Sequence, residues 1–148
     1  MQYLVSDREM KNLDRNTSEH FHVPEIVLME QAANAFIKVF ARFRNDAANI
    51  LIVCGTGNNG ADGIAIARLL RQQNISAAVC IPFMQTKQTD SFRLQYQIYT
   101  EYGYPVVSYD QSWESYTVLI DAMFGIGLSR EIEGLSLIHI SEPTRHLR

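Results

Sequence analysis

Residues 49–63 read N-I-L-I-V-C-G-T-G-N-N-G-A-D-G, and this stretch decides the fold class. Its first six residues are an asparagine and five successive apolar residues, a run that is typical of a parallel strand covered on both faces. Four of the eight glycines follow directly, and a helical pattern begins after them. The stretch therefore predicts a strand, a glycine-rich turn and a helix over residues 63–73.

The same alternation continues along the chain. Residues 77–81, 106–108 and 117–120 are predicted strands, and residues 89–102 a predicted helix with aromatic residues at helical steps. A capping box at Ser6 predicts a helix that ends before residue 20, and Pro24 suits the first turn of another. The apolar stripe of this second helix consists of Ile26, Met29, Ala33, Phe36, Phe40 and Phe43. Strands that alternate with helices predict an α/β fold, with a mostly parallel sheet and helices on both faces.

Composition limits the function classes. With 148 residues, 47% of them hydrophobic, the chain has the size of one domain. A net charge of -3 disfavours a nucleic-acid or acidic-membrane partner. No stretch reaches the roughly 20 apolar residues that span a bilayer, and the polar N-terminus does not resemble a signal peptide, so we expect a cytoplasmic protein without a membrane partner. Cys54 and Cys80 lie in predicted strands and are expected to be small core residues.

The glycine turn carries the strongest chemical signal. Gly55, Gly57 and Gly60 match G-x-G-x-x-G between a strand and a helix, where exposed backbone N–H groups bind phosphate. The alternative is a tight turn without a ligand. An ordinary nicotinamide dehydrogenase would place Asp or Glu about 20 residues further on, at the end of the second strand. The second predicted strand here, residues 77–81, instead runs into C-I-P-F at residues 80–83. The Lys-Ser/Thr of a phosphate-binding P-loop is also missing.

Polar side chains add a second signal in the same turn. Asn58, Asn59 and Asp62 bring two amides and a carboxylate to a place where a simple phosphate cradle avoids negative charge. Asp62 either caps the following helix or, together with Asn59, coordinates a cation. The residues alone leave both interpretations open.

A second glycine loop, D-A-M-F-G-I-G-L-S-R-E-I-E-G, covers residues 121–134. Because the carboxyl ends of parallel strands share one edge, Asp121, Gly125 and Gly127 are expected near Asn58 and its neighbours. Asp121 is either a ligand or a turn former, and Arg130 either neutralises a phosphate or is solvated.

Three blocks of sequence together resemble the YjeF N-terminal domain, the NAD(P)H-hydrate epimerase family. They are Y-L-V-S-D-R-E-M-K-N-L-D with L-M-E-Q-A-A-N-A, then G-T-G-N-N-G-A-D-G-I-A-I-A-R-L-L, then V-L-I-D-A-M-F-G-I-G-L-S-R. The resemblance implies a Rossmann-like three-layer α/β/α domain. It also implies an isomerase that interconverts the R and S epimers of hydrated NADH and NADPH (NADHX and NADPHX) in nicotinamide nucleotide repair.

The resemblance also implies a set of site residues and a potassium ion. Asn59 and Asp121 would be potassium ligands. The family usually has Gly where this chain has Ala61. The residues implied to bind the hydrated dinucleotide are Asn58, Asn59, Gly60, Ala61 and Asp62, with Gly125, Ile126, Gly127, Leu128, Ser129, Arg130 and Glu131 around its phosphates.

The C-terminal end departs from the family. Family members continue into a strand ending in a D-x-P-S-G-like segment, which supplies a further potassium ligand and an acid or base, and nothing here matches it. Residues 135–148 resemble translated sequencing adapter, although residues 137–140 would also suit a genuine strand. We therefore expect a truncated domain over residues 1–134 with an incomplete sheet, a non-native tail over residues 135–148, no assigned catalytic residue and low turnover.

The resemblance implies partners as well. They are a possible second copy in a homodimer and an ADP- or ATP-dependent dehydratase, fused or separate. Two alternatives stay open. One is a non-catalytic dinucleotide- or partner-binding scaffold, as in YjeF-like domains of RNA decapping proteins. The other is a conventional oxidoreductase, which the missing ribose carboxylate disfavours.

Overall fold

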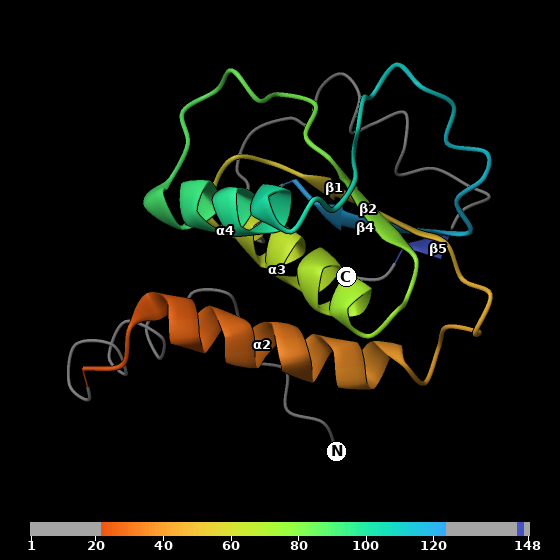
Figure 1. Cartoon of the computed structure of the whole chain (residues 1–148), viewed down its shortest axis with the longest axis horizontal. Coiled ribbons are helices and arrows are strands. Elements are labelled where there is room, and N and C mark those ends of the chain that lie inside the picture. Colours follow the sequence, from red (N-terminus) through yellow and green to blue (C-terminus); the bar gives the residue numbers. More distant parts are fainter. Residues whose placement is uncertain (1–21, 124–144, 147–148) are drawn as a thin grey trace.

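A computed structural model describes residues 22–123 and 145–146 (Figure 1). Its strands form one sheet in the order β3-β2-β1-β4-β5, and every neighbouring pair is parallel. This is the strand order of a Rossmann fold, so the predicted α/β fold with its parallel sheet is confirmed. The elements are α2 (Glu25–Phe40), β1 (Ile50–Cys54), α3 (Asn58–Gln72), β2 (Ala77–Cys80), α4 (Asp90–Glu101), β3 (Val106–Val107), β4 (Val118–Ala122) and β5 (Arg145–His146).

Strands β1 to β4 agree with the predicted ranges to within one or two residues, whereas β5 was not predicted and lies within residues 135–148. β1 is buried along its whole length because it pairs with β2 on one side and with β4 on the other. β5 pairs with the start of β4, Val118 opposite Arg145. The predicted helix before residue 20 and the second glycine loop from residue 124 onward lie outside the described residues.

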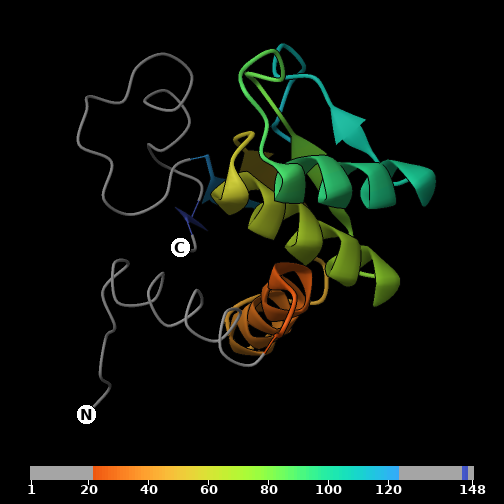
Figure 2. The ribbon, with the colours of Figure 1, turned by 90° about the vertical axis from the view of Figure 1, so that its left-hand side faces the viewer.

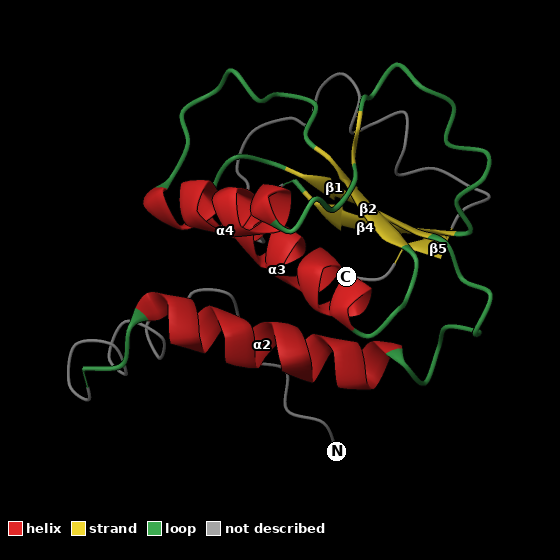
Figure 3. Ribbon diagram, in the orientation of Figure 1, coloured by secondary structure: helices red, strands yellow, loops and turns green. Residues whose placement is uncertain are grey.

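The helices that the structure describes cover one face of the sheet (Figures 2 and 3). α3 packs on β1, β2 and β4, and both α2 and α4 pack on α3. Side chains of β1 alternate between this face, with Ile50 and Ile52, and the opposite face, with Leu51 and Val53. On the opposite face the loop side chains Phe83, Trp113 and Tyr116 pack against the strands. The second helical layer of the predicted three-layer arrangement is not found within residues 22–123.

α2 buries Met29, Ala33 and Phe40 of its predicted stripe, whereas Ile26 and Phe36 are half-buried and the buried Ile37 was not predicted. Pro24 is the N-cap, and the buried positions Met29, Ala33, Ile37 and Phe40 repeat at helical spacing. Phe43 was predicted to continue the stripe, which is wrong, because α2 ends at Phe40 and leaves the Phe43 side chain 67% exposed. None of the helices in the described part combines the length and apolar character that crossing a membrane requires.

Both cysteines are buried core residues, as predicted. Burial raises the pKa of Cys80 to about 11, and burial raises the pKa of Cys54 still further above its ordinary range.

We expect neither thiol to react with iodoacetamide at pH 8 in the folded protein, because the thiolate is the reactive form. Both should react in denaturant, and mass spectrometry reads the difference. The folded pKa of the Cys80 thiol lies above its unfolded value. The contribution of this thiol to stability is therefore complete at pH values below the unfolded pKa and falls as the pH rises toward 11. Rapid labelling of the native protein at pH 8 would contradict this burial.

Candidate functional site

The glycine turn brings the ends of β1 and β4 into contact with the first turn of α3. The N–H of Gly55 donates to the carbonyl of Ala122 at 3.1 Å. A Cβ at Gly55 would lie 2.5 Å from the Met123 carbonyl oxygen, and a Cβ at Gly60 would lie 1.8 Å from the Gly55 carbonyl oxygen. Two of the glycines are therefore required by close backbone packing. The shared edge of β1 and β4 is the place where ligands bind in open α/β sheets.

Gly57 differs from its neighbours. Among residues 22–123 and 145–146, no atom lies within 4 Å of a Cβ built at this position. Gly57 is the N-cap of α3 with φ -94° and ψ -166°, an extended conformation open to any residue. Packing against the described residues and backbone conformation do not require glycine here, although glycine is a common N-cap residue.

The start of α3 is suited to an anion. Its N-cap residue, Gly57, has no side chain that could cap the helix, and its first turn contains no acidic residue. The first N–H groups of a helix lack partners within the helix, and the helix dipole places partial positive charge there. A phosphate group fits this combination.

α3 begins five residues earlier than predicted. Residues 58–62 were assigned to the loop, but they form the first turns of the helix. The early start depends on Gly60, which lets the helix lie against Gly55, and on Gly63, where a Cβ would lie 2.6 Å from the Ala122 Cβ. The interpretation of Asp62 as the N-cap is therefore wrong, because Gly57 holds that position.

The predicted ligand residues of this turn differ in exposure. Asn58 is exposed, Asn59 and Asp62 are half-buried, and Gly60 is buried. Ala61 is fully buried in the core, and its N–H donates to the Gly57 carbonyl at 3.0 Å. Their contacts with a dinucleotide stay predictions.

Sequence patterns missed the partner of Asn58. The Nδ2 group of Asn58 donates to Oε1 of Glu25 at 3.1 Å, across 33 residues of chain. Glu25 stands in the first turn of α2, one helical turn before the buried Met29. An acidic residue just after Pro24 was visible in the sequence, but its contact depends on how α2 packs on α3.

Asp121 lies at the same sheet edge, within β4 and opposite Val53. The prediction that it follows the strand is wrong, because β4 continues to Ala122. Its Oδ1 accepts a hydrogen bond from the Met123 N–H at 3.0 Å, which is the turn-forming contact considered for it above. The carboxylate is half-buried, beside the start of the second glycine loop.

The donor chemistry at this edge fits a hard monovalent cation better than a transition metal. Asn59 and Asp121 offer an amide oxygen and a single carboxylate. Hard cations prefer such oxygen ligands, and a potassium ion at this edge stays a prediction. No group of three or more His, Cys, Asp or Glu side chains suited to a metal exists within the described ranges.

A third segment meets the glycine turn, and sequence reasoning did not find it. Thr56 is buried, with its Oγ1 2.7 Å from the Oγ1 of Thr86, and it donates to the Lys87 carbonyl at 2.9 Å. The N–H of Thr89 donates to the Thr56 carbonyl at 3.0 Å. The loop between β2 and α4 is thereby fastened to the turn that follows β1.

The chain is similar to proteins of one family. The profile described as YjeF-related protein N-terminus matches residues 25–144. The NAD(P)H-hydrate epimerase of Weissella koreensis is 37% identical, with 86% of this chain and 58% of that protein covered. The same-named protein of Oenococcus oeni is 38% identical, covering 88% of this chain and 62% of that protein.

A third relative and one solved structure extend the comparison. The NAD(P)H-hydrate epimerase of Leuconostoc mesenteroides is 37% identical, over 97% of this chain and 67% of that protein. The crystal structure of yeast ynu0 shares the fold with a TM-score of 0.73 at 19% identity, covering 92% of this chain and 62% of that one. The chain thus spans about three fifths of the length of the first two relatives. On the profile match and these identities, the chain belongs to the YjeF-related N-terminal domain family.

Proposed function

We propose that this domain is an NAD(P)H-hydrate epimerase, which binds NADHX or NADPHX at the edge formed by Gly57, the start of α3 and the end of β4. The observation that carries the proposal is the space at Gly57, the N-cap of α3, which no atom of residues 22–123 fills. Relatives named NAD(P)H-hydrate epimerase support the choice of ligand.

In this proposal the chain's own residues bind and orient the dinucleotide. The N–H groups of the first turn of α3 hold a phosphate. A carboxylate only accepts hydrogen bonds, so Glu25 fixes Nδ2 of Asn58 toward itself and leaves the amide oxygen to accept from the ligand. Asn59 and Asp121 would hold potassium, which supplies positive charge beside the phosphates when bound.

Epimerisation needs a partner reaction to be useful, because it only equilibrates two forms of a damaged cofactor. The proposal therefore includes an ADP- or ATP-dependent dehydratase, fused or separate, that consumes one epimer in the cytoplasm. A homodimer stays a prediction.

The substitution Gly57→Ala tests the proposal. Alanine tolerates this backbone conformation, so we expect a melting temperature close to that of the original chain. The added methyl enters the space assigned to the phosphate, so the affinity for NADPHX should fall by about tenfold or more. Calorimetric titration measures the affinity. Gly103→Ala is the matched control: Gly103 has φ +73°, so alanine there should cost about 1 kcal/mol of stability and leave the affinity unchanged.

The same samples separate the competing functions. The epimerase proposal expects slow equilibration of R and S epimers by the original chain, below the rate of a full-length relative because no catalytic residue is assigned. It also expects a larger thermal shift with dinucleotide in potassium than in sodium. Absence of both dinucleotide binding and epimer exchange would overturn it in favour of the scaffold alternative.

A further inference from the structure

The loop between β2 and α4, residues 81–89, lies against the glycine turn of the proposed site. Thr56, between two glycines of the turn, holds it through the Thr86 hydroxyl and the Lys87 carbonyl. The loop then returns to the same residue, because the Thr89 N–H donates to the Thr56 carbonyl. The backbone of Lys87 is therefore directly beside the glycine turn.

Contacts within the loop hold it in one conformation. The Thr86 hydroxyl contacts the Phe83 carbonyl at 2.7 Å, and Nε2 of Gln88 donates to the Met84 carbonyl at 3.1 Å. Arg93 of α4 donates to the Gln88 carbonyl at 2.9 Å. A loop fixed in this way loses little conformational entropy when a ligand binds.

The charge of this loop is opposite to that of an NAD-selective site. In a Rossmann fold, a carboxylate beyond the second strand binds the ribose 2′-hydroxyl of NAD, whereas a cation there accommodates the 2′-phosphate of NADP. Residues 81–89 contain no carboxylate and one cation, Lys87. The next carboxylate, Asp90, is paired with Arg93.

We infer that residues 81–89 form the adenosine-ribose end of the site, and that Lys87 contacts the 2′-phosphate so that the domain prefers NADPHX to NADHX. This inference rests on the proposed function. Thr56 is the positioning residue, since it holds the Lys87 backbone against the glycine turn. The preference arises from charge: an exposed ammonium attracts the additional phosphate dianion and makes charge-assisted hydrogen bonds with it.

The test compares affinities for NADPHX and NADHX by calorimetric titration. Lys87→Gln should lower the affinity for NADPHX by roughly tenfold and that for NADHX by less than about twofold, as expected for one charge-assisted contact. Lys87→Glu should reverse the preference. Lys38→Gln is the matched control, an exposed lysine in the last turn of α2 that should leave both affinities unchanged.

A second pair of variants tests the positioning by Thr56. Thr56→Ser keeps the hydroxyl and should keep the preference, whereas Thr56→Val should reduce it toward equal affinities. A structural role alone would lower the melting temperature without changing the ratio of the two affinities.

The outcomes separate the two proposals. Binding of both hydrates with a ratio that Lys87→Gln leaves unchanged overturns the inference about Lys87 and leaves the proposed function standing. A chain that binds neither hydrate overturns both. A change of the ratio confined to the Lys87 and Thr56→Val variants supports both.

Discussion

Replacing Gly60 with alanine is expected to lower the free energy of unfolding by about 3 kcal/mol or more, a large effect for one methyl group. The new Cβ would lie 1.8 Å from the carbonyl oxygen of Gly55 and 2.6 Å from its carbonyl carbon. Both are backbone atoms of a tight turn whose N–H is bonded to β4, so neither can rotate away. The start of α3 would have to move off the sheet. Urea denaturation followed by circular dichroism measures the loss.

Gly57 and Gly63 provide graded controls for this substitution. Alanine at Gly57, three residues before Gly60, would meet no atom of the described residues and should leave stability nearly unchanged. At Gly63 the nearest atoms are the side chains of Ala122 and Cys54, at 2.6 and 2.9 Å. Small shifts of α3 can relieve part of that overlap, so we expect an intermediate loss. Equal stability of the Gly57→Ala and Gly60→Ala variants would contradict the contact between Gly60 and Gly55.

The sheet could be predicted from the sequence because each strand carries its own signal. The run from residue 50 to residue 54 is apolar at every position, and β1 is buried along its whole length. The helix after it was placed too late because Asn, Gly and Asp are poor helix formers. What lets α3 begin at Asn58 is a tertiary contact, the approach of Gly60 to Gly55, and no local pattern reports that.

Site residues that follow strands could be predicted from the sequence, whereas contacts between segments far apart in the chain could not. Asp121 was placed at the correct sheet edge because parallel strands end together. The contact of Glu25 with Asn58 joins residues 33 positions apart, and that of Thr56 with Lys87 joins residues 31 apart. Neither pair has a periodic spacing that a sequence pattern could show.

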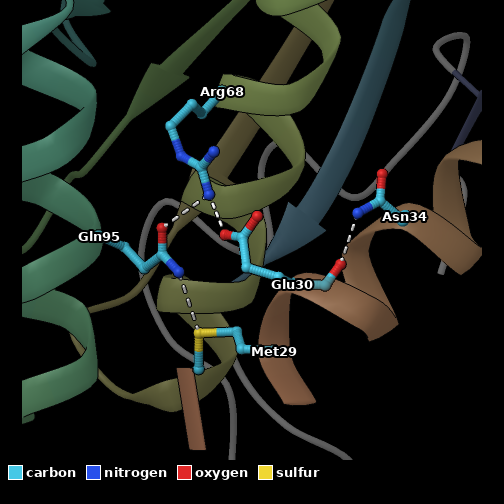
Figure 4. A network of polar contacts seen from close by, with 5 residues as sticks. All are labelled: Met29, Glu30, Asn34, Arg68 and Gln95. Atoms are coloured by element: carbon cyan, nitrogen blue, oxygen red, sulfur yellow. Dashed lines mark hydrogen bonds and ion pairs between the residues drawn. The ribbon is translucent and has the colours of Figure 1, made fainter. Parts of the chain in front are cut away.

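An ion pair between a buried arginine and a half-buried glutamate joins two helices (Figure 4). Arg68 of α3, with a side chain only 8% exposed, pairs with Glu30 of α2. The same guanidinium lies 3.5 Å from Oε1 of the buried Gln95 of α4, whose Nε2 contacts the sulfur of Met29 at 3.5 Å. Nε of Arg68 has no hydrogen-bond partner within the described residues, so the charge depends mainly on Glu30.

Glu30→Ala is therefore expected to lower the free energy of unfolding by about 3 kcal/mol, because it leaves a buried guanidinium without its counter-charge. Urea denaturation at pH 7 measures the loss. The substitution should also weaken dinucleotide binding, since α2 carries Glu25 to its contact with Asn58. Stability and affinity are then lost together, unlike in Gly57→Ala, where only affinity falls.

The double variant Glu30→Ala, Arg68→Met decides whether the unpaired charge is the cause. Methionine fills much of the arginine volume without a charge, so the double variant should regain most of the stability that Glu30→Ala loses. If the loss came instead from the packing of the Glu30 side chain, removing Arg68 as well would lower stability further. An additive loss in the double variant would contradict the electrostatic role of the pair, whereas recovery would show that Glu30 is needed chiefly because Arg68 is buried.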